Sequence, residues 1–162
     1  MIVVSDTTPI ISLTKLNLLD VLGKLYGEVI LPKAVFDEIC ASQAFSNEAR
    51  AVQYCDFIKV RNIDDLQAVK TLRDAGLDLG ESEAIVLAEM LPDSLLLMDE
   101  RKGRKIALNM GLRITGTLGI LIQAKNIGFV KQAKPLLDTL INANIRISES
   151  LYYSILGQVD EQ

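Results

Sequence analysis

Short runs of β-branched and other apolar residues alternate along the chain with longer amphipathic stretches. This alternation is typical of a parallel sheet whose strands are joined by crossover helices. The apolar runs predict five strands: Ile2–Val4, Glu28–Leu31, Phe57–Val60, Leu95–Met98 and Leu112–Ile114. The amphipathic stretches predict helices over Pro9–Tyr26 (interrupted near Leu16–Asn17), Pro32–Ala41, Ser46–Cys55, Asp64–Ala75, Gly80–Leu91, Glu100–Met110, Thr117–Asn126, Lys131–Asn142 and Ser148–Gly157.

Glycines lie where several of these helices should stop, at Gly27, Gly76 and Gly111. No internal repeat and no interdomain linker is found. The length of 162 residues fits one core, so we expect a single domain over 1–162 with a helical extension from about residue 131.

The composition excludes several classes of catalytic and metal-binding site. Histidine is absent, which excludes Ser-His-Asp and Cys-His catalysis and zinc sites that need histidine. Two cysteines, Cys40 and Cys55, are too few for a disulfide framework and favour buried thiols in a reducing compartment. No apolar run approaches the roughly 18 residues of a membrane span, and no signal-like segment precedes Asp6. We therefore expect a cytoplasmic protein with no membrane partner.

Charge is unevenly distributed. The net charge is −4, yet residues 95–134 hold eight basic and two acidic side chains. Clustered Lys and Arg beside an otherwise acidic chain suit a flank that binds a polyanion. An ordinary solvated helix face over Arg101–Lys105 also explains the cluster, and is the simpler explanation of the charges taken alone.

Aspartates follow two of the predicted strands, at Asp6 and Asp99. Ligands of open parallel sheets bind at the carboxyl ends of strands, so this pair indicates a shared acidic pocket. Each residue is also placed to cap the helix that follows it.

The positions of the other acids along their predicted helices indicate which side chains face the apolar side and which face solvent. In Pro32–Ala41, Lys33 and Asp37 can pair on the solvent face, whereas Glu38 lies toward the apolar side. Glu81 lies on the apolar side of its own helix, Glu83 flanks that side, and Glu89 points to solvent. A capping box of Glu81 with Asp78 is the alternative.

Several acids near apolar faces need a compensating cation. Oxygen ligands without histidine or thiolate select Mg²⁺ or Mn²⁺. Two such ions can activate water and stabilise the in-line displacement of a phosphodiester. No phosphate-binding loop of the G-x-x-x-x-G-K-[ST] or G-x-G-x-x-G type occurs, so no nucleotide cofactor is indicated.

Five segments together resemble the PIN-domain superfamily, in particular a prokaryotic PIN-like group of unknown function close to VapC-type toxins. They are residues 4–11, residues 29–32 with Val35 and Glu38, residues 77–85, residues 98–101 with Arg104 and Ala107, and residues 114–119. The likeness covers nearly the whole chain. It implies a three-layer α/β/α sandwich on a parallel sheet of about five strands and a Mg²⁺- or Mn²⁺-dependent endoribonuclease that cuts single-stranded RNA.

The resemblance also implies residue roles. By motif position, the metal-binding acids are Asp6, Glu38, Glu81 and Asp99, with Glu83 as an accessory ligand. Thr8 would orient a metal-bound water or phosphate, and Thr117 would contact the scissile region. Substrate phosphates would be held by Arg101, Arg104 and Lys105.

VapC-type enzymes commonly have Thr-x-Asp at the fourth strand, where this chain has Leu97 two residues before Asp99. A supporting hydroxyl must then come from Thr8, Thr115 or Thr117. The resemblance further implies a homodimer and, for a type II toxin, a small antitoxin protein as partner.

Two other functions compete with the nuclease. A catalytically weak PIN-like module that binds protein or RNA would also keep the acids. A phosphoacceptor receiver domain needs an adjacent acid pair after the first strand and a lysine after the last, and Ser5-Asp6 and residues 112–116 supply neither.

Overall fold

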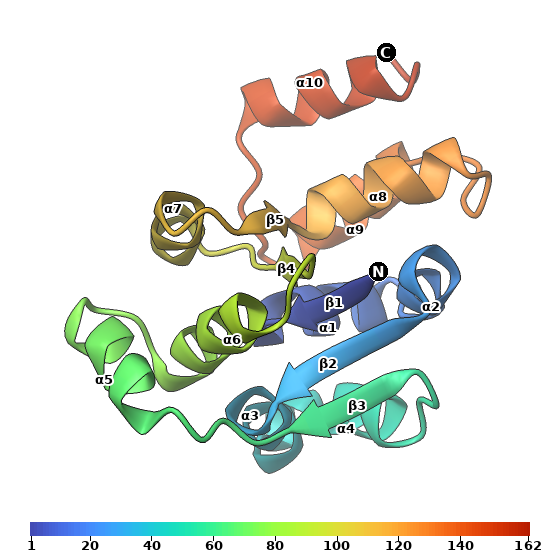
Figure 1. Cartoon of the computed structure of the whole chain (residues 1–162). Helices are drawn as coiled ribbons and strands as arrows, with labels where there is room; N and C mark the ends of the chain where they lie inside the picture. The colour runs from blue at the N-terminus through green and yellow to red at the C-terminus, as the bar shows by residue number, and fades with distance from the viewer. The chain divides into compact units, whose positions relative to one another are not determined.

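The computed structural model describes all residues from Met1 to Gln162. The chain divides into two compact units, Met1–Gly116 and Thr117–Gln162. The first unit carries the whole sheet, and the second is built of helices (Figure 1). The second unit therefore begins before Lys131, where the sequence placed the start of a helical extension.

The sheet of the first unit is parallel and has the strand order β3-β2-β1-β4-β5. Its strands are β1 (Ile2–Ser5), β2 (Glu28–Pro32), β3 (Ile58–Arg61), β4 (Leu95–Leu97) and β5 (Arg113–Thr115), so all five predicted strands are confirmed. The chain proceeds from β1 outward to β3, then returns to the other side of β1 for β4. The strand order thus reverses between β1 and β4, which is where open α/β sheets bind their ligands.

The helices of the first unit lie close to their predicted bounds. They are α1 (Thr7–Lys15), α2 (Asp20–Tyr26), α3 (Lys33–Ala41), α4 (Ser46–Gln53), α5 (Leu66–Asp74), α6 (Leu79–Met90) and α7 (Arg101–Asn109), with a short 3₁₀ helix, η1 (Gln43–Phe45), that the sequence analysis did not predict. The break expected near Leu16–Asn17 is present. Pro32 ends β2 instead of opening a helix, because its extended backbone conformation is that of a strand.

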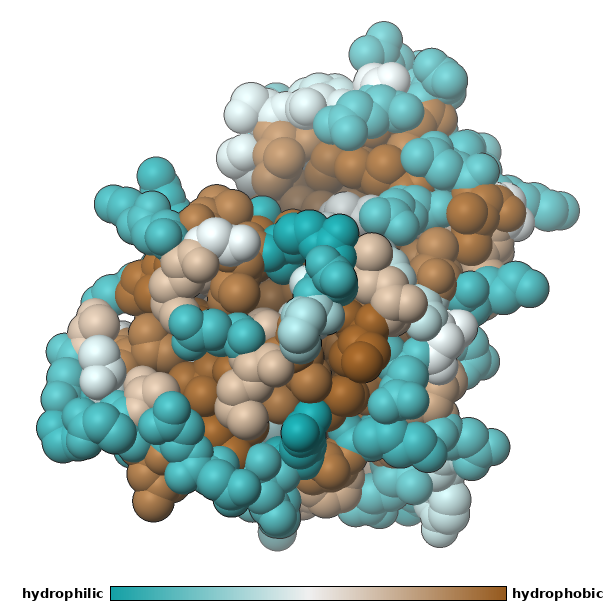
Figure 2. Space-filling view, viewed as in Figure 1, coloured by the Kyte–Doolittle hydropathy of each residue, from teal (hydrophilic) through white to brown (hydrophobic).

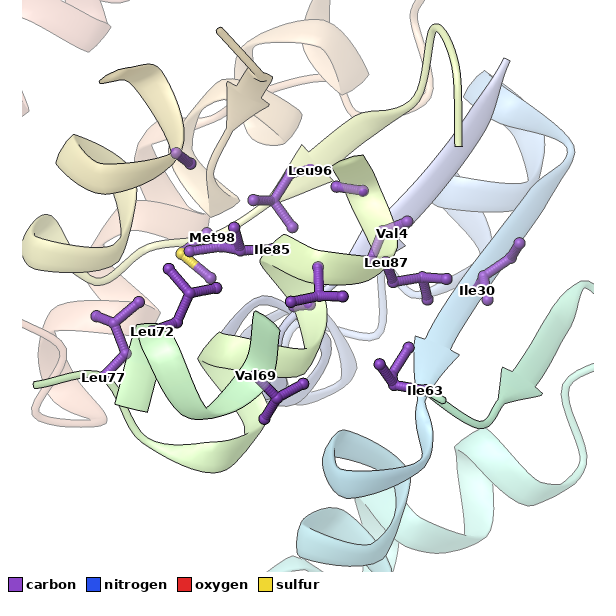
Figure 3. Close-up of a cluster of buried hydrophobic side chains, with 14 residues drawn as sticks. Val4, Ile30, Ile63, Val69, Leu72, Leu77, Ile85, Leu87, Leu96 and Met98 are labelled. Carbon is purple, nitrogen blue, oxygen red and sulfur yellow. The ribbon is translucent and has the colours of Figure 1, made fainter. Parts of the chain in front are cut away.

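Helices cover both faces of the sheet, which explains why adjacent strand residues such as Val3 and Val4 are both fully buried. On one face, apolar side chains of α5, α6 and α7 pack against β1, β2 and β4. Figure 3 shows Ile85 and Leu87 of α6 beside Val4 of β1 and Leu96 of β4. This packing fixes α6 against the strands whose ends carry the candidate site.

The surface is mixed in character. Figure 2 shows hydrophilic side chains over much of the viewed face, with hydrophobic side chains visible between them. The large exposed apolar side chains of α5 and α6 are Leu66, Leu79 and Met90. No helix combines the length and the apolar character that crossing a membrane requires.

The second unit contains α8 (Thr117–Asn126), α9 (Lys134–Asn142) and α10 (Glu149–Gln158). Glu161, near the end of the chain, accepts hydrogen bonds from the backbone N–H groups of Ala133 (2.6 Å) and Lys134 (3.0 Å). Its carboxylate also pairs with Lys125 at 3.3 Å. The chain terminus thereby fastens the start of α9 to α8 within this unit.

Candidate functional site

Asp6 lies directly at the point where the strand order reverses. It follows β1, and its backbone N–H donates to the carbonyl of Leu97 at the end of β4, at 3.0 Å. The register of β1 on β4 sets Ser5 opposite Leu97. The two predicted strand-end aspartates, Asp6 and Asp99, therefore leave the sheet at the same edge from neighbouring strands.

Asp6 occupies the N-cap position of α1, but its side chain makes no cap hydrogen bond. An N-cap carboxylate usually accepts from the N–H at position N2 or N3. Position N3 of α1 is Pro9, which has no N–H to donate. The residue is only 6% exposed, so Asp6 is buried without the usual cap hydrogen bond to N2 or N3.

Glu38 reaches the same place from α3. Its Oε2 accepts a hydrogen bond from the hydroxyl of Thr7 at 2.6 Å, which ties α3 to the first turn of α1. The neighbouring Thr8, expected to supply the hydroxyl of the site, is exposed. The hydroxyl that contacts Glu38 is that of Thr7.

Gly80, at the start of α6, forms the floor between these two acids. A Cβ atom placed on Gly80 would lie 3.3 Å from Oε2 of Glu38 and 3.6 Å from Oδ1 of Asp6. Both carboxylate oxygens thus border a small space that any other residue at this position would fill. We call Asp6, Glu38 and this space at Gly80 the carboxylate cradle.

Glu81 is next to Gly80 in the sequence, but its carboxylate also takes part in a capping box at the start of α6. Its Oε2 accepts from the N–H of Asp78 at 2.9 Å, and Oδ1 of Asp78 accepts from the N–H of Glu81 at 2.8 Å. The capping box considered as an alternative for Glu81 is therefore present. Burial raises the pKa of Glu81, the hydrogen bond with the Asp78 backbone lowers it, and the charges of Asp78, Glu100 and Glu38 raise it further.

Asp6 has the most perturbed acidity in the site. Burial is the main reason that its pKa rises from an ordinary 3.8 to about 7. A hydrogen bond with the Thr7 backbone opposes this rise only in part. Three carboxylates also raise the pKa of Asp6, those of Asp78, Glu81 and Glu38. These groups consequently form one electrostatically coupled acidic cluster.

This coupling predicts how stability depends on pH when a chelator keeps metal away. The folded protein holds the Asp6 proton up to about pH 7, whereas the unfolded chain loses it near pH 3.8. The resulting stabilisation is complete below pH 3.8 and is lost as pH rises through about 7, a contribution of about 4 kcal/mol. Denaturant unfolding of the wild type and of Asp6→Asn from pH 4 to 8 measures it as a pH-dependent difference. A constant difference would contradict it.

Glu83, expected as an accessory metal ligand, makes a contact of another kind. Its Oε1 accepts from the backbone N–H of Ala34 at 3.1 Å, in the first turn of α3. A side-chain acceptor at a helix N-terminus satisfies a donor that has no partner within the helix. Glu83 therefore links α6 to the start of the helix that carries Glu38.

We expect this contact to position Glu38. Glu83→Ala should increase hydrogen exchange at the Ala34 amide and lower the expected metal-dependent cleavage, each about fivefold, because losing a cap costs about 1 kcal/mol. Glu83→Gln should retain both properties, since an amide oxygen still accepts the bond. Glu89→Gln, an exposed acid of the same helix, is the control. Equal defects in Glu83→Gln and Glu83→Ala would instead indicate a metal ligand.

Asp99 lies in a cavity whose lining includes neither Asp6 nor Glu38. This cavity has a volume of about 450 Å³ and is lined by Asp99, Arg101, Arg104, Lys105, Leu108 and Asn109. The N-cap of α7 is Glu100, so Asp99 does not occupy the cap position considered for it. A Cβ on Gly116 would lie 2.6 Å from Oδ1 of Asp99 and 3.1 Å from Nη1 of Arg104. The structure thus brings the three predicted phosphate-binding residues together beside Asp99.

Arg104 is also anchored in this cavity. Its Nη1 donates to the carbonyl of Met98 at 2.8 Å, which joins α7 to the end of β4. Arg101 and Lys105 line the cavity and are exposed to solvent. The cavity therefore offers two exposed cations, Arg101 and Lys105, and one anchored guanidinium, that of Arg104, for an anionic ligand.

The carboxylate cradle fits a hard divalent cation by the chemistry of its donors. No three acidic or cysteine side chains are arranged as a ready-made metal cage. Magnesium, however, commonly binds through one or two carboxylates and completes its shell with water and substrate phosphate. Asp6 and Glu38 supply two oxygens at the cradle, and Glu81 borders it.

A comparison with protein families matches residues 2–161 to the family DUF3368, described as a PIN domain. The chain belongs to this family. Comparisons with curated proteins and with solved structures find no match. The PIN domain is a nuclease-like fold that typically uses divalent metals, in keeping with the acids gathered at the strand ends.

The sequence analysis of this PIN domain missed several residues of the site. Thr7, Gly80 and Glu100 take part in it through the contact with Glu38, the cradle floor and the charge felt by Glu81. The glycine that precedes Glu81 was a signal for a close approach at residue 80. Thr117, expected to contact the scissile region, begins the second unit and stays a prediction.

Proposed function

We propose that this PIN domain is a Mg²⁺- or Mn²⁺-dependent endoribonuclease that cleaves single-stranded RNA. The observation that carries the proposal is the convergence of the Asp6 and Glu38 oxygens on Gly80, at the reversal of strand order. A buried Asp6 carboxylate that is coupled to the acids Asp78, Glu81 and Glu38 costs free energy when it is ionised. Binding of a divalent cation by Asp6 and Glu38 would offset this cost.

In this mechanism the protein residues hold and orient the reactants. Asp6 and Glu38 would be the ligands, with Glu81 and Asp99 at the margins as further acids, and Thr7 keeps the Glu38 carboxylate in place. A bound divalent ion would lower the pKa of water and stabilise the charge on the phosphate. Arg101, Arg104 and Lys105 would hold backbone phosphates of the RNA and fix its path across the strand ends.

The test is cleavage of an unstructured RNA by the purified protein. We expect hydrolysis with Mg²⁺ or Mn²⁺, products with 5′-phosphate and 3′-hydroxyl ends, and no hydrolysis in EDTA. Cleavage that continues in EDTA would contradict a metal-dependent mechanism.

The absence of a ready-made cage of three acids favours one other function, a weakly active PIN-like module that binds RNA or protein. That module would bind RNA in EDTA and show no hydrolysis on addition of Mn²⁺. Isothermal titration with Mn²⁺ separates the two functions, because the module would also bind no metal.

We further propose that the nuclease is the toxin of a type II toxin–antitoxin pair. Its partners would be a small antitoxin protein and a second copy of the chain. A short gene for a small DNA-binding protein directly upstream supports the toxin role, and its absence counts against it. Co-expression of the two genes should relieve growth inhibition caused by the nuclease alone.

A further inference from the structure

A cavity of about 450 Å³ opens between α3 and the start of α6. Its lining consists of Ala34, Asp37, Glu38, Ala41, Asp78, Leu79 and Gly80. Glu38 and Gly80 belong to both this cavity and the carboxylate cradle. A ligand held here would therefore lie directly beside the proposed reaction centre, in a volume typical of small-molecule pockets.

The walls of the cavity are small or apolar. Ala34 and Ala41 lie two helical turns apart on α3 and present only methyl groups to the cavity. Leu79 contributes an aliphatic side chain from the first position of α6, and 41% of it is exposed. Such a large apolar side chain at the mouth of a polar site suits contact with the flat face of an aromatic ring.

The polar side chains of the cavity are carboxylates, which accept hydrogen bonds and donate none. Asp37 pairs through Oδ1 with Lys33, and Asp78 uses Oδ1 for the N–H of Glu81. The Oδ2 atom of each remains to accept from a ligand. A ring that enters this cavity must therefore present N–H donors at its edge.

We propose that this cavity, the base pocket, binds an unpaired nucleobase that carries an exocyclic amino group, next to the scissile phosphate. The inference rests on the proposed ribonuclease function and names the part of the substrate that the site selects. Adenine, cytosine and guanine carry amino groups that can donate hydrogen bonds to carboxylates. Uracil has a single N–H donor on this edge, at N3, and carbonyl oxygens where the other bases carry amino groups. The carboxylates of Asp37 and Asp78 repel those oxygens.

The test compares fluorescein-labelled oligoribonucleotides of equal length made of A, C or U. Binding is measured by fluorescence anisotropy in EDTA, which separates recognition from hydrolysis, and cleavage is measured with Mn²⁺. We expect oligo-A and oligo-C to bind about tenfold more tightly than oligo-U and to be cleaved faster, the effect of one specific base contact.

Two variants should reduce this selectivity. Asp37→Asn should bring the affinities for oligo-C and oligo-U to within about twofold, because its amide can donate to the uracil carbonyl. Leu79→Ala should weaken binding of every oligonucleotide about fivefold, through loss of contact with the base face. Asp74→Asn is the matched control, since Asp74 pairs with Lys70 on α5 as Asp37 pairs with Lys33 on α3.

The outcomes distinguish the inference from the proposed function. Equal affinity for all three oligonucleotides, or a preference that survives Asp37→Asn, overturns the base pocket even if RNA is cleaved. A preference that disappears in Asp37→Asn without any cleavage in Mn²⁺ supports the base pocket and overturns the ribonuclease.

Discussion

Asp6→Asn should abolish RNA cleavage and at the same time make the metal-free protein more stable. The carboxylate is a metal ligand in our account, so its loss should lower the cleavage rate by about 10³-fold or more, equivalent to about 4 kcal/mol. Near pH 8 the same carboxylate is ionised against its raised pKa of about 7. A neutral amide removes that cost, and its N–H groups can donate to the Glu38 carboxylate.

Single-turnover cleavage in Mn²⁺ and urea unfolding in EDTA measure the two effects of Asp6→Asn. Asp74→Asn, which replaces an exposed aspartate of α5, should change neither quantity appreciably. Loss of activity together with lower stability would show that Asp6 has a structural role and would overturn its assignment as a ligand.

Gly80→Ala should also separate activity from stability. Its new methyl group would stand 3.3 Å from Oε2 of Glu38 and 3.6 Å from Oδ1 of Asp6, in the space that an ion and its waters need. We expect cleavage and Mn²⁺ affinity to fall by about 100-fold, at the upper end of what displaced ligand geometry costs. Alanine in place of glycine in α6 should leave the free energy of unfolding unchanged or raise it by up to about 1 kcal/mol.

Mn²⁺ titration and thermal unfolding of Gly80→Ala test this pair of effects. The larger Gly80→Val should show a deeper loss of affinity, because it fills more of the same space. Wild-type Mn²⁺ affinity in both variants would place the metal away from the carboxylate cradle.

The sequence predicted the strands and most helices because their signals are local. Apolar runs marked the buried strands, and helix-stopping glycines marked the ends of α2 and α5, where Gly27 and Gly76 have φ of 86° and 102°. The position of η1 and the role of Pro32 were missed. Both depend on how the chain turns between elements rather than on periodicity.

The sequence predicted which acidic residues belong to the site, but it did not predict how their side chains are arranged. Helical phase placed Glu38 toward the apolar side of its helix, whereas the structure leaves this residue exposed with its Oε2 on the Thr7 hydroxyl. The predicted pairing of Lys33 with Asp37 is confirmed. The contact of Thr7 with Glu38 was not predicted, because α1 begins at Thr7 instead of Pro9. The roles of Thr8, Thr115 and Thr117 stay predictions. The contact of Glu83 with Ala34 joins residues 49 positions apart, which no local pattern reveals.

The central claim is that Asp6 and Glu38 jointly bind a hard divalent cation. Isothermal titration of Mn²⁺ into metal-free protein near pH 8 tests it directly, because the ligands must be deprotonated. The account predicts saturable binding by the wild type and by the exposed-acid variant Glu89→Gln, and loss of binding in both Asp6→Asn and Glu38→Gln. Absence of Mn²⁺ binding by the wild type, or unchanged binding in those two variants, would contradict it.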